Sequence, residues 1–147
     1  IAEHKGKPPR SGRMAFDDVL QQADFITLHC PFSTETHHLI SRREFELMKP
    51  SAYLINTARG KLVHEADLLH CLSTGRIAGA AIDVIQEEPP GKDNLILQHP
   101  PENLIITPHV AWASRESRQR LLDQLADNIG NFFQNRPFNQ ITEALGQ

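Results

Sequence analysis

Short apolar runs that alternate with helix-like segments restrict the fold of this chain more than any other feature. The runs span Phe25–Leu28, Ala52–Ile55, Ile77–Val84 and Leu104–Thr107. Runs that are apolar throughout, rather than at every second residue, are typical of parallel strands covered on both faces. The sequence therefore predicts an α/β fold, with a doubly wound parallel sheet and helices on both faces.

Helical signals occupy the intervals between these runs. Phe16–Ala23 carries apolar residues at the i, i+3, i+4 and i+7 spacing of a short amphipathic helix. Ser41 and Glu44 have capping-box spacing at the start of a second helix, and His64–Thr74 predicts a third. A long helix is expected over residues 114–133. The apolar residues along one side of this helix are Leu121, Leu122, Leu125, Ile129, Phe132 and Phe133.

Composition argues against several classes of partner. The formal net charge is -3 and the pI is about 6.2, so no basic excess points to nucleic acid or to an anionic membrane. No apolar run approaches the roughly 20 residues of a membrane span. Cys30 and Cys71 form neither a metal-ligand spacing nor a disulfide framework. We therefore expect a cytoplasmic protein with reduced thiols and without a metal, nucleic-acid or membrane partner.

The polar residues that follow each apolar run are the candidates for function. In parallel sheets ligands bind at the carboxyl ends of the strands. Those positions are held here by Glu3, His29, the segment 56–59, Asp83 and His109. Because all these ends meet at one edge of the predicted sheet, we expect the side chains to face a common site.

Arg59, Glu88 and His109 form the most informative group. A guanidinium can bind a carboxylate through two parallel hydrogen bonds, and Gly60 beside Arg59 allows a close backbone approach. A histidine paired with a carboxylate can act as a general acid near neutral pH. Each residue also has an ordinary interpretation, as an ion pair or an acidic loop. Together they predict an anion clamp, a carboxylate partner and a proton donor.

Glu3, His29 and Cys30 are weaker candidates when each is considered alone. Glu3 fits the acidic position that accepts hydrogen bonds from an adenosine ribose, but a surface glutamate beside a turn fits equally well. His29 can equally be a histidine that hydrogen-bonds the backbone at a strand end. Cys30 as a nucleophile needs a nearby base, which the sequence does not identify. His37 and His38 are interpreted as surface loop residues.

Two long motifs resemble a known family. "LINTARGKLVHEADLLHCLSTGRIAGAAIDVIQEEPP" and "NLIITPHVAWAS" closely resemble the D-isomer-specific 2-hydroxyacid dehydrogenases. The "HVAWAS" form with Trp112, and the opening "IAEHKGK", are most similar to the glycerate dehydrogenase or hydroxypyruvate reductase branch. The resemblance extends from Glu3 to the last helix and implies a partial Rossmann-type fold.

The resemblance also implies a role for individual residues. Arg59 would bind the substrate carboxylate and carbonyl, Glu88 would pair with His109, and His109 would donate the proton. Glu3 would hold the adenosine ribose and disfavour the phosphate of NADP. The remaining residues implied to line NAD are His29, Cys30, Pro31, Thr57, Ala58, Asp83, Ala111 and Trp112, together with Arg59 and His109.

The family likeness also sets an expected domain organisation. Residues 1–113 would form the C-terminal part of an NAD-binding domain whose first strand and glycine-rich loop are missing. Residues 114–147 would form a long helix and a tail that returns toward a missing catalytic domain. The chain begins at Ile1, within an apolar run, so we expect it to be a segment of a longer polypeptide that forms a homodimer. By itself the segment should bind NADH weakly and be inactive.

The implied activity is NADH-dependent reduction of a small 2-keto acid, hydroxypyruvate or glyoxylate, to the D-2-hydroxy acid, or the reverse oxidation of D-glycerate. Formate dehydrogenases share the fold but place glutamine where Glu88 stands, so this carboxylate favours hydroxy-acid chemistry. One alternative is a dinucleotide-sensing scaffold similar to the carboxy-terminal binding protein corepressors, which keep a similar triad. Another is a cofactor domain that has lost its function.

Overall fold

The computed structural model describes residues 1–140. The chain divides into two units, the first spanning residues 1–109 and the second beginning at Val110. The division falls after His109, a few residues before the boundary between 113 and 114 that the sequence suggests. Each unit is described by itself below.

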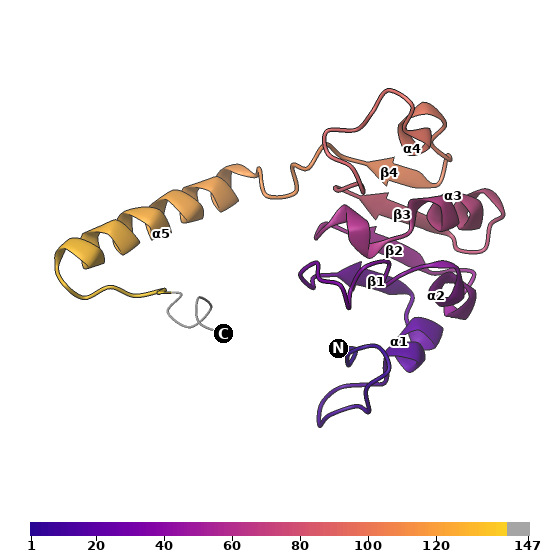
Figure 1. Ribbon diagram of the computed structural model, residues 1–147, viewed down its shortest axis with the longest axis horizontal. Coiled ribbons are helices and arrows are strands. Elements are labelled where there is room, and N and C mark those ends of the chain that lie inside the picture. Colours follow the sequence, from indigo (N-terminus) through magenta and orange to yellow (C-terminus); the bar gives the residue numbers. More distant parts are fainter. Residues whose placement is uncertain (141–147) are drawn as a thin grey trace. The chain divides into compact units, whose positions relative to one another are not determined.

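A four-stranded parallel sheet forms the centre of the first unit (Figure 1). The strands are β1 (Phe25–Leu28), β2 (Tyr53–Asn56), β3 (Gly79–Ile82) and β4 (Leu104–Ile106), and they lie in the order β1-β2-β3-β4. Phe25 pairs with Tyr53, and Tyr53 with Gly79, so the first three strands begin at the same level. All carboxyl ends therefore meet at one edge of the sheet, as the sequence predicts.

One helix precedes β1, and the others connect successive strands of this sheet. Those of the first unit are α1 (Phe16–Gln22), α2 (Arg42–Leu47), the short 3-10 helix η1 (Gly60–Leu62), α3 (Glu65–Ser73) and α4 (Leu95–Gln98). The sequence predicts α1, α2 and α3, but it misses η1 and α4, each of which is no longer than four residues. Gly75 adopts a positive φ of 66° and ends α3, a conformation that costs glycine little.

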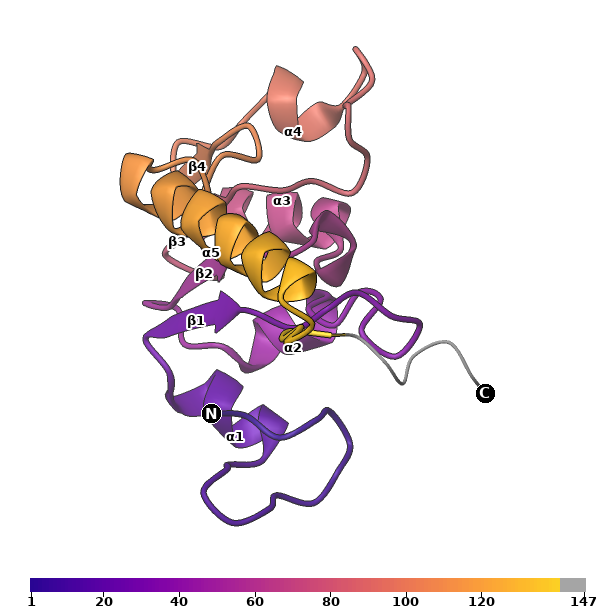
Figure 2. The same ribbon diagram turned by 90° about the vertical axis from the view of Figure 1, so that its left-hand side faces the viewer.

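The helices α2 and α3 lie on the same side of the strands (Figure 2). Residues on one face of the sheet, such as Ile26, Leu54 and Ala80, are buried, whereas Phe25 and Tyr53 on the other face are exposed. A parallel crossover is right-handed, so strands added in one direction place their helices on one face. Covering the second face would require strands added in the opposite direction from β1. The described part of the first unit thus has helices on one face, where the sequence suggests both.

The hydrophobic core lies between this covered face and the helices. Its largest fully buried members include Phe45 from α2, Leu54 from β2 and Leu68 from α3. Every residue of the core cluster falls between Leu20 and Leu104. The first unit therefore builds its core from its own residues.

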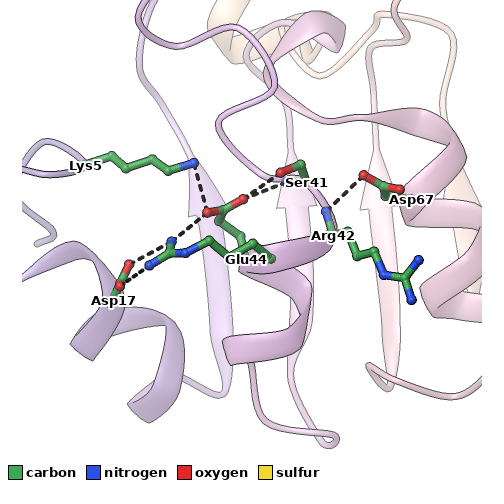
Figure 3. Close-up of polar contacts among 7 residues, drawn as sticks. Lys5, Asp17, Ser41, Arg42, Glu44 and Asp67 are labelled. Carbon is green, nitrogen blue, oxygen red and sulfur yellow. Dashed lines mark hydrogen bonds and ion pairs between the residues drawn. The ribbon is translucent and has the colours of Figure 1, made fainter.

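A buried carboxylate holds the N-terminal loop against α2 (Figure 3). Glu44 is fully buried and contacts Lys5 Nζ at 2.8 Å and Arg43 Nη1 at 2.8 Å, and Arg43 also pairs with Asp17 of α1. Ser41 completes the capping box, because its hydroxyl accepts from the Glu44 backbone N–H and its own backbone N–H donates to the Glu44 carboxylate. The Ser41 hydroxyl also donates to that carboxylate at 2.7 Å. Burial alone would raise the pKa of Glu44, but these hydrogen bonds, that from Lys5 first, lower it to about 2.

The chain before α1 forms a single bridge instead of a full strand. Ala2 pairs in parallel with Met14, with Glu3 N–H donating to Met14 O at 2.8 Å and Met14 N–H to Ile1 O at 3.1 Å. This pair is not part of the four-stranded sheet. The strand end predicted at Ile1–Glu3 is therefore present only as this bridge.

The second unit contains α5 (Arg115–Phe133), close to the predicted helix. Its N-cap is Ser114, whose hydroxyl accepts a hydrogen bond from Ser117 N–H. None of its residues is buried, and all six of the apolar residues predicted along one side are exposed. Within residues 1–140, no helix combines the length and apolar character that a membrane crossing requires.

Candidate functional site

Arg59 stands at the carboxyl end of β2, on a turn built by Asn56. The buried Asn56 side chain accepts from Ala58 N–H at 3.1 Å and donates to Arg59 O at 2.9 Å. One amide therefore fixes both ends of the turn that presents Arg59. The Arg59 side chain is exposed, and its Nη1 donates to Ala58 O at 2.6 Å.

Gly60, the next residue, packs against the loop that follows β3. A Cβ atom added at Gly60 would lie 1.8 Å from Ile85 O and 2.6 Å from Gln86 N, far inside van der Waals contact. Because Gly60 has no side chain, the backbone of Ile85 can pack directly against it. Because the loop that contains Ile85 also carries Glu88, this contact sets the spacing between the Arg59 turn and the Glu88 loop.

Gln86 and Glu65 join the same loop to its neighbours. Gln86 Nε2 donates to Val63 O at 2.8 Å and lies 3.2 Å from His38 Nε2, and Gln86 N–H donates to the carboxylate of Glu65. These contacts connect the loops after β1, β2 and β3. The sequence analysis did not identify Gln86 or Glu65. The only feature of the sequence that points to Gln86 is its place as a polar residue shortly after the apolar run Ile77–Val84.

Three imidazoles gather beside Gln86. His37 stacks on His38 with ring centroids 3.7 Å apart, and the ring of His38 meets that of His64 at 4.7 Å. Partial burial, and then the neighbouring His37 and His64, lower the pKa of His38. His37 is exposed, as expected of a loop residue, whereas His38 is part of the contact between loops.

Glu88 and His109 are in contact. His109 Nδ1 lies 2.8 Å from Glu88 Oε2, and Ile85 N–H donates to Glu88 Oε1 at 3.0 Å. The backbone of His109 has a positive φ of 54°, and its N–H donates to Asp83 O at 2.8 Å. Because the Glu88 carboxylate contacts Nδ1, a proton that His109 gave to a substrate would leave from Nε2.

Asp83 is buried at the carboxyl end of β3, and the Thr107 hydroxyl donates to its carboxylate. Beside it lies an open hollow of about 440 Å³, whose lining includes Asp83, Glu88, Thr107 and His109. A buried carboxylate at a strand end can accept a hydrogen bond from a carboxamide, so Asp83 fits the nicotinamide end of NAD.

The segments that follow β1 and β2 supply the remaining predicted contacts of the first unit. The His29 ring lies 2.7 Å from Thr27 Oγ1, and Pro31 O accepts from the Thr36 hydroxyl at 2.9 Å. Cys30 is half-buried, and burial raises the pKa of its thiol, which disfavours a thiolate nucleophile.

Thr57 and Ala58 lie on the Arg59 turn. They directly follow β2, and the residues 29–31 directly follow β1. All five residues are therefore at the edge of the sheet that carries Arg59.

Glu3 lies beside the bridge that precedes α1. Arg10 binds its carboxylate, with Nε at 2.7 Å from Oε2 and Nη2 at 2.8 Å from Oε1. The hydrogen bond from the Arg10 side chain is the main reason that the pKa of Glu3 falls to about 2. The Glu3 side chain is only 2% exposed, so Arg10 covers the predicted ribose acceptor.

Ala111 and Trp112 belong to the second unit, where Ala113 N–H donates to Val110 O at 2.8 Å. Trp112 is exposed. Their predicted role beside the nicotinamide stays a prediction. In residues 1–140, no group of three or more His, Cys, Asp or Glu side chains is arranged to hold a metal ion.

The chain matches a known family over most of its length. The model of the "D-isomer specific 2-hydroxyacid dehydrogenase, NAD binding domain" family matches residues 3–111. The chain therefore belongs to the D-isomer-specific 2-hydroxyacid dehydrogenases, and the matched residues are the NAD-binding domain of that family.

Individual relatives agree with this assignment. A glycerate dehydrogenase of Methylorubrum extorquens is 47% identical over 90% of this chain and 42% of its own length. The NAD complex of a D-isomer-specific 2-hydroxyacid dehydrogenase of Lactobacillus delbrueckii ssp. bulgaricus is 31% identical, with a TM-score of 0.78, over 88% of this chain and 43% of that one.

An acyclic imino acid reductase, solved with NADPH and D-Arg, is 33% identical with a TM-score of 0.77, over 96% of this chain and 45% of that one. The chain thus spans less than half the length of these relatives. All three are enzymes by name, so they give the corepressor alternative no support.

Proposed function

We propose that this chain is the cofactor-binding part of an NADH-dependent reductase of small 2-keto acids. The substrates we expect are hydroxypyruvate and glyoxylate, with D-glycerate oxidation as the reverse reaction. The contact between His109 Nδ1 and Glu88 Oε2, at 2.8 Å, is the observation that carries the proposal. The identity to a glycerate dehydrogenase supports this choice of substrate class.

The proposed roles of the three residues follow from the charge that develops during reduction. Negative charge builds on the carbonyl oxygen of the keto acid, and a proton donor beside that oxygen stabilises the transition state more than the ground state. We assign the proton to His109 Nε2. Glu88 fixes the ring through Nδ1 and stabilises the imidazolium.

We assign Arg59 the role of binding the carboxylate of the substrate. Its exposed guanidinium can grip a carboxylate with two parallel hydrogen bonds and so orient the 2-keto group. Asn56 is assigned a positioning role, because its amide fixes the turn that presents Arg59. The cofactor, when bound, supplies the hydride.

The test is an initial-rate assay of NADH oxidation with hydroxypyruvate, glyoxylate and pyruvate, in the complete protein that contains this chain. His109→Ala should lower the rate about 100-fold or more, because a general acid contributes at least that factor. His70→Ala, at an exposed position on α3, is the matched control and should keep the wild-type rate. Unchanged activity in His109→Ala would remove this residue from the mechanism.

We further propose that the complete protein is a cytoplasmic homodimer without nucleic-acid or membrane partners. The 147-residue chain alone should bind NADH weakly and turn over no substrate, because it spans under half the length of the relatives described above. Hydroxypyruvate-dependent NADH oxidation by the pure chain would contradict this expectation.

A further inference from the structure

Gln86 joins the loop after β3 to two other loops through its side chain. Its Nε2 donates to Val63 O at 2.8 Å and lies 3.2 Å from His38 Nε2. Val63 follows η1 on the segment after β2, and His38 lies in the loop after β1. One amide nitrogen therefore holds three segments together, at a position two residues before Glu88.

The two contacts of this amide define the protonation state of His38. A backbone carbonyl can only accept a hydrogen bond, so the nitrogen of the Gln86 amide, and not its oxygen, faces Val63. The second N–H of the same nitrogen can bond His38 Nε2 only if that ring nitrogen accepts. A protonated imidazole carries an N–H on both ring nitrogens and accepts nothing. The contact therefore requires a neutral His38, with its proton on Nδ1.

The surroundings of His38 favour this neutral form. The titratable groups that face its ring are His37 on the same loop and His64 and Asp67 at the start of α3. Partial burial first, and then His37 and His64, lower the pKa of His38, whereas Asp67 raises it by less. The His38 N–H donates to Lys61 O at 2.9 Å, so the backbone beside the ring is fixed as well.

The backbone of Gln86 connects this contact to Glu88. Gln86 N–H donates to the carboxylate of Glu65, in the first turn of α3. The preceding residue, Ile85, donates its own N–H to Glu88 Oε1 at 3.0 Å, and Glu88 Oε2 lies 2.8 Å from His109 Nδ1. The place where Gln86 is held thus determines where the donor to Glu88 lies.

We propose that Gln86 and His38 form a latch that positions Glu88 for the proposed reaction and opens when His38 takes up a proton. Both are positioning residues, since they act on His109 only through Glu88. The inference deepens the proposed function and rests on it. Above the pKa of His38 the latch is closed. As the pH falls through this pKa, an N–H of Gln86 faces an N–H of His38, and the contact becomes repulsive.

The first test follows the latch in the 147-residue chain without a substrate. An NMR titration between about pH 8 and pH 5, where histidines titrate, records the His38 ring and the Ile85 N–H. Both signals should share a step below the ordinary histidine value of 6.5. His38→Gln keeps an acceptor oxygen but cannot titrate, so this step should vanish from the Ile85 signal. A step that His109 causes through Glu88 should remain in both proteins.

His37→Gln is the matched control for this titration. It removes the neighbouring imidazole of the same loop and leaves the pair of His38 and Gln86 in place. The shared step should therefore remain in the Ile85 signal. It should also move to higher pH, because His37 contributes to the lowered pKa of His38.

The second test measures the proposed reaction in the complete protein that contains this chain. Gln86→Leu removes both hydrogen bonds of the amide and should lower kcat about twofold to tenfold, the factor that one such bond contributes. KM should change little, because the substrate carboxylate is assigned to Arg59. Gln98→Leu is the matched control, since Gln98 Nε2 also donates to a backbone carbonyl, Lys92 O at 2.7 Å, and it should keep the wild-type kcat.

The pH profile distinguishes a latch from a contact that only stabilises the fold. His38→Gln should keep the wild-type kcat near neutral pH and lose less of it on acidification, because its amide oxygen accepts from Gln86 at every pH. A purely structural contact would leave the shape of the profile unchanged. Since His38→Gln retains an acceptor, it tests the latch even if Gln86→Leu does not fold.

The outcomes separate this inference from the proposed function. An Ile85 step that persists unchanged in His38→Gln, or a wild-type kcat in Gln86→Leu, would overturn the inference and leave the reductase standing. If the complete protein reduces no keto acid, the proposed function is refuted, and the role assigned to Glu88 with it, although the step shared by His38 and Ile85 would still be observed.

Discussion

At the scale of single residues, the candidate site depends on backbone contacts as much as on the side chains proposed for the chemistry. Arg59, Glu88 and His109 could be selected from the sequence, because each follows a predicted strand and parallel strands end at one edge. The close approach of Gly60 to Ile85 could not be predicted from the sequence. A backbone contact between residues 25 positions apart leaves no mark on the pattern of polar and apolar side chains.

Arg10 was missed for a similar reason. It lies seven residues from Glu3, across a loop containing Pro8 and Pro9, and no periodic structure predicts that the two side chains meet. The sequence identified the acid but not the cation that covers it. The role of Glu3 as an acceptor for ribose hydroxyls stays a prediction, and Arg10 is the residue such a hydroxyl would have to displace.

Gly60→Ala should destabilise the first unit. The new methyl group would lie 1.8 Å from Ile85 O, so one of the two loops must move, at a cost of about 2 kcal/mol or more. Urea denaturation measures this free energy. In the complete protein the displaced loop should also lower the reduction rate, because Ile85 N–H holds Glu88.

Gly130→Ala is the matched control for Gly60→Ala. Gly130 lies inside α5 with nothing near an added Cβ atom, so alanine should stabilise that helix by about 0.5–1 kcal/mol. If both variants have the same stability, close packing at Gly60 does not constrain the loops.

At the scale of elements, the sequence located helices and strands better than it located their ends. The run Ile77–Val84 predicted a long strand, but β3 spans only Gly79–Ile82. A parallel strand can pair only as far as its neighbours extend, and β2 is itself four residues long. The helix α4 escaped detection because four residues are too few to show a helical period.

The contact between the N-terminal loop and α2 should make stability depend on acid pH. The pKa of Glu44 is about 2 in the folded chain and 4.5 as the ordinary value. A carboxyl group with a lowered pKa stabilises the fold fully above its unfolded value, and this contribution disappears as pH falls through the folded value. The free energy of unfolding should therefore decrease as the pH falls from about 4.5 to about 2.

Lys5→Met isolates this contribution, because it removes the hydrogen bond that lowers the pKa of Glu44 most. The acid-unfolding midpoint, followed by circular dichroism, should move to higher pH. Lys7→Met carries the same change of charge in the same loop and should leave the midpoint near that of the wild type. Coincident acid transitions for all three proteins would refute the role assigned to Lys5.

At the scale of the whole molecule, one face of the sheet is uncovered within the described residues of the first unit. Phe25 stacks on Tyr53 with centroids 5.5 Å apart, and Ile105 is 66% exposed on the same face. Contiguous exposed apolar surface promotes association. We expect the 147-residue chain to self-associate as its concentration rises.

Ile105→Thr should weaken that association about tenfold, because burying an isoleucine side chain contributes about 1.5–3 kcal/mol and threonine still suits a strand. Sedimentation over a concentration series measures the change. Leu95→Thr, at a similarly exposed apolar residue in α4 and not in a strand, should have little effect. Equal weakening by both substitutions would mean that the sheet face is not the contact surface.

The division of the chain after His109 has a consequence for dissecting the protein. Arg59, Glu88 and His109 all belong to the first unit, and the core cluster ends at Leu104. A stop codon placed after Ala113 would thus remove α5 while retaining the three residues and every member of that core. The long helix could then be exchanged for that of a relative, as an interchangeable module, without redesigning the three residues proposed for catalysis.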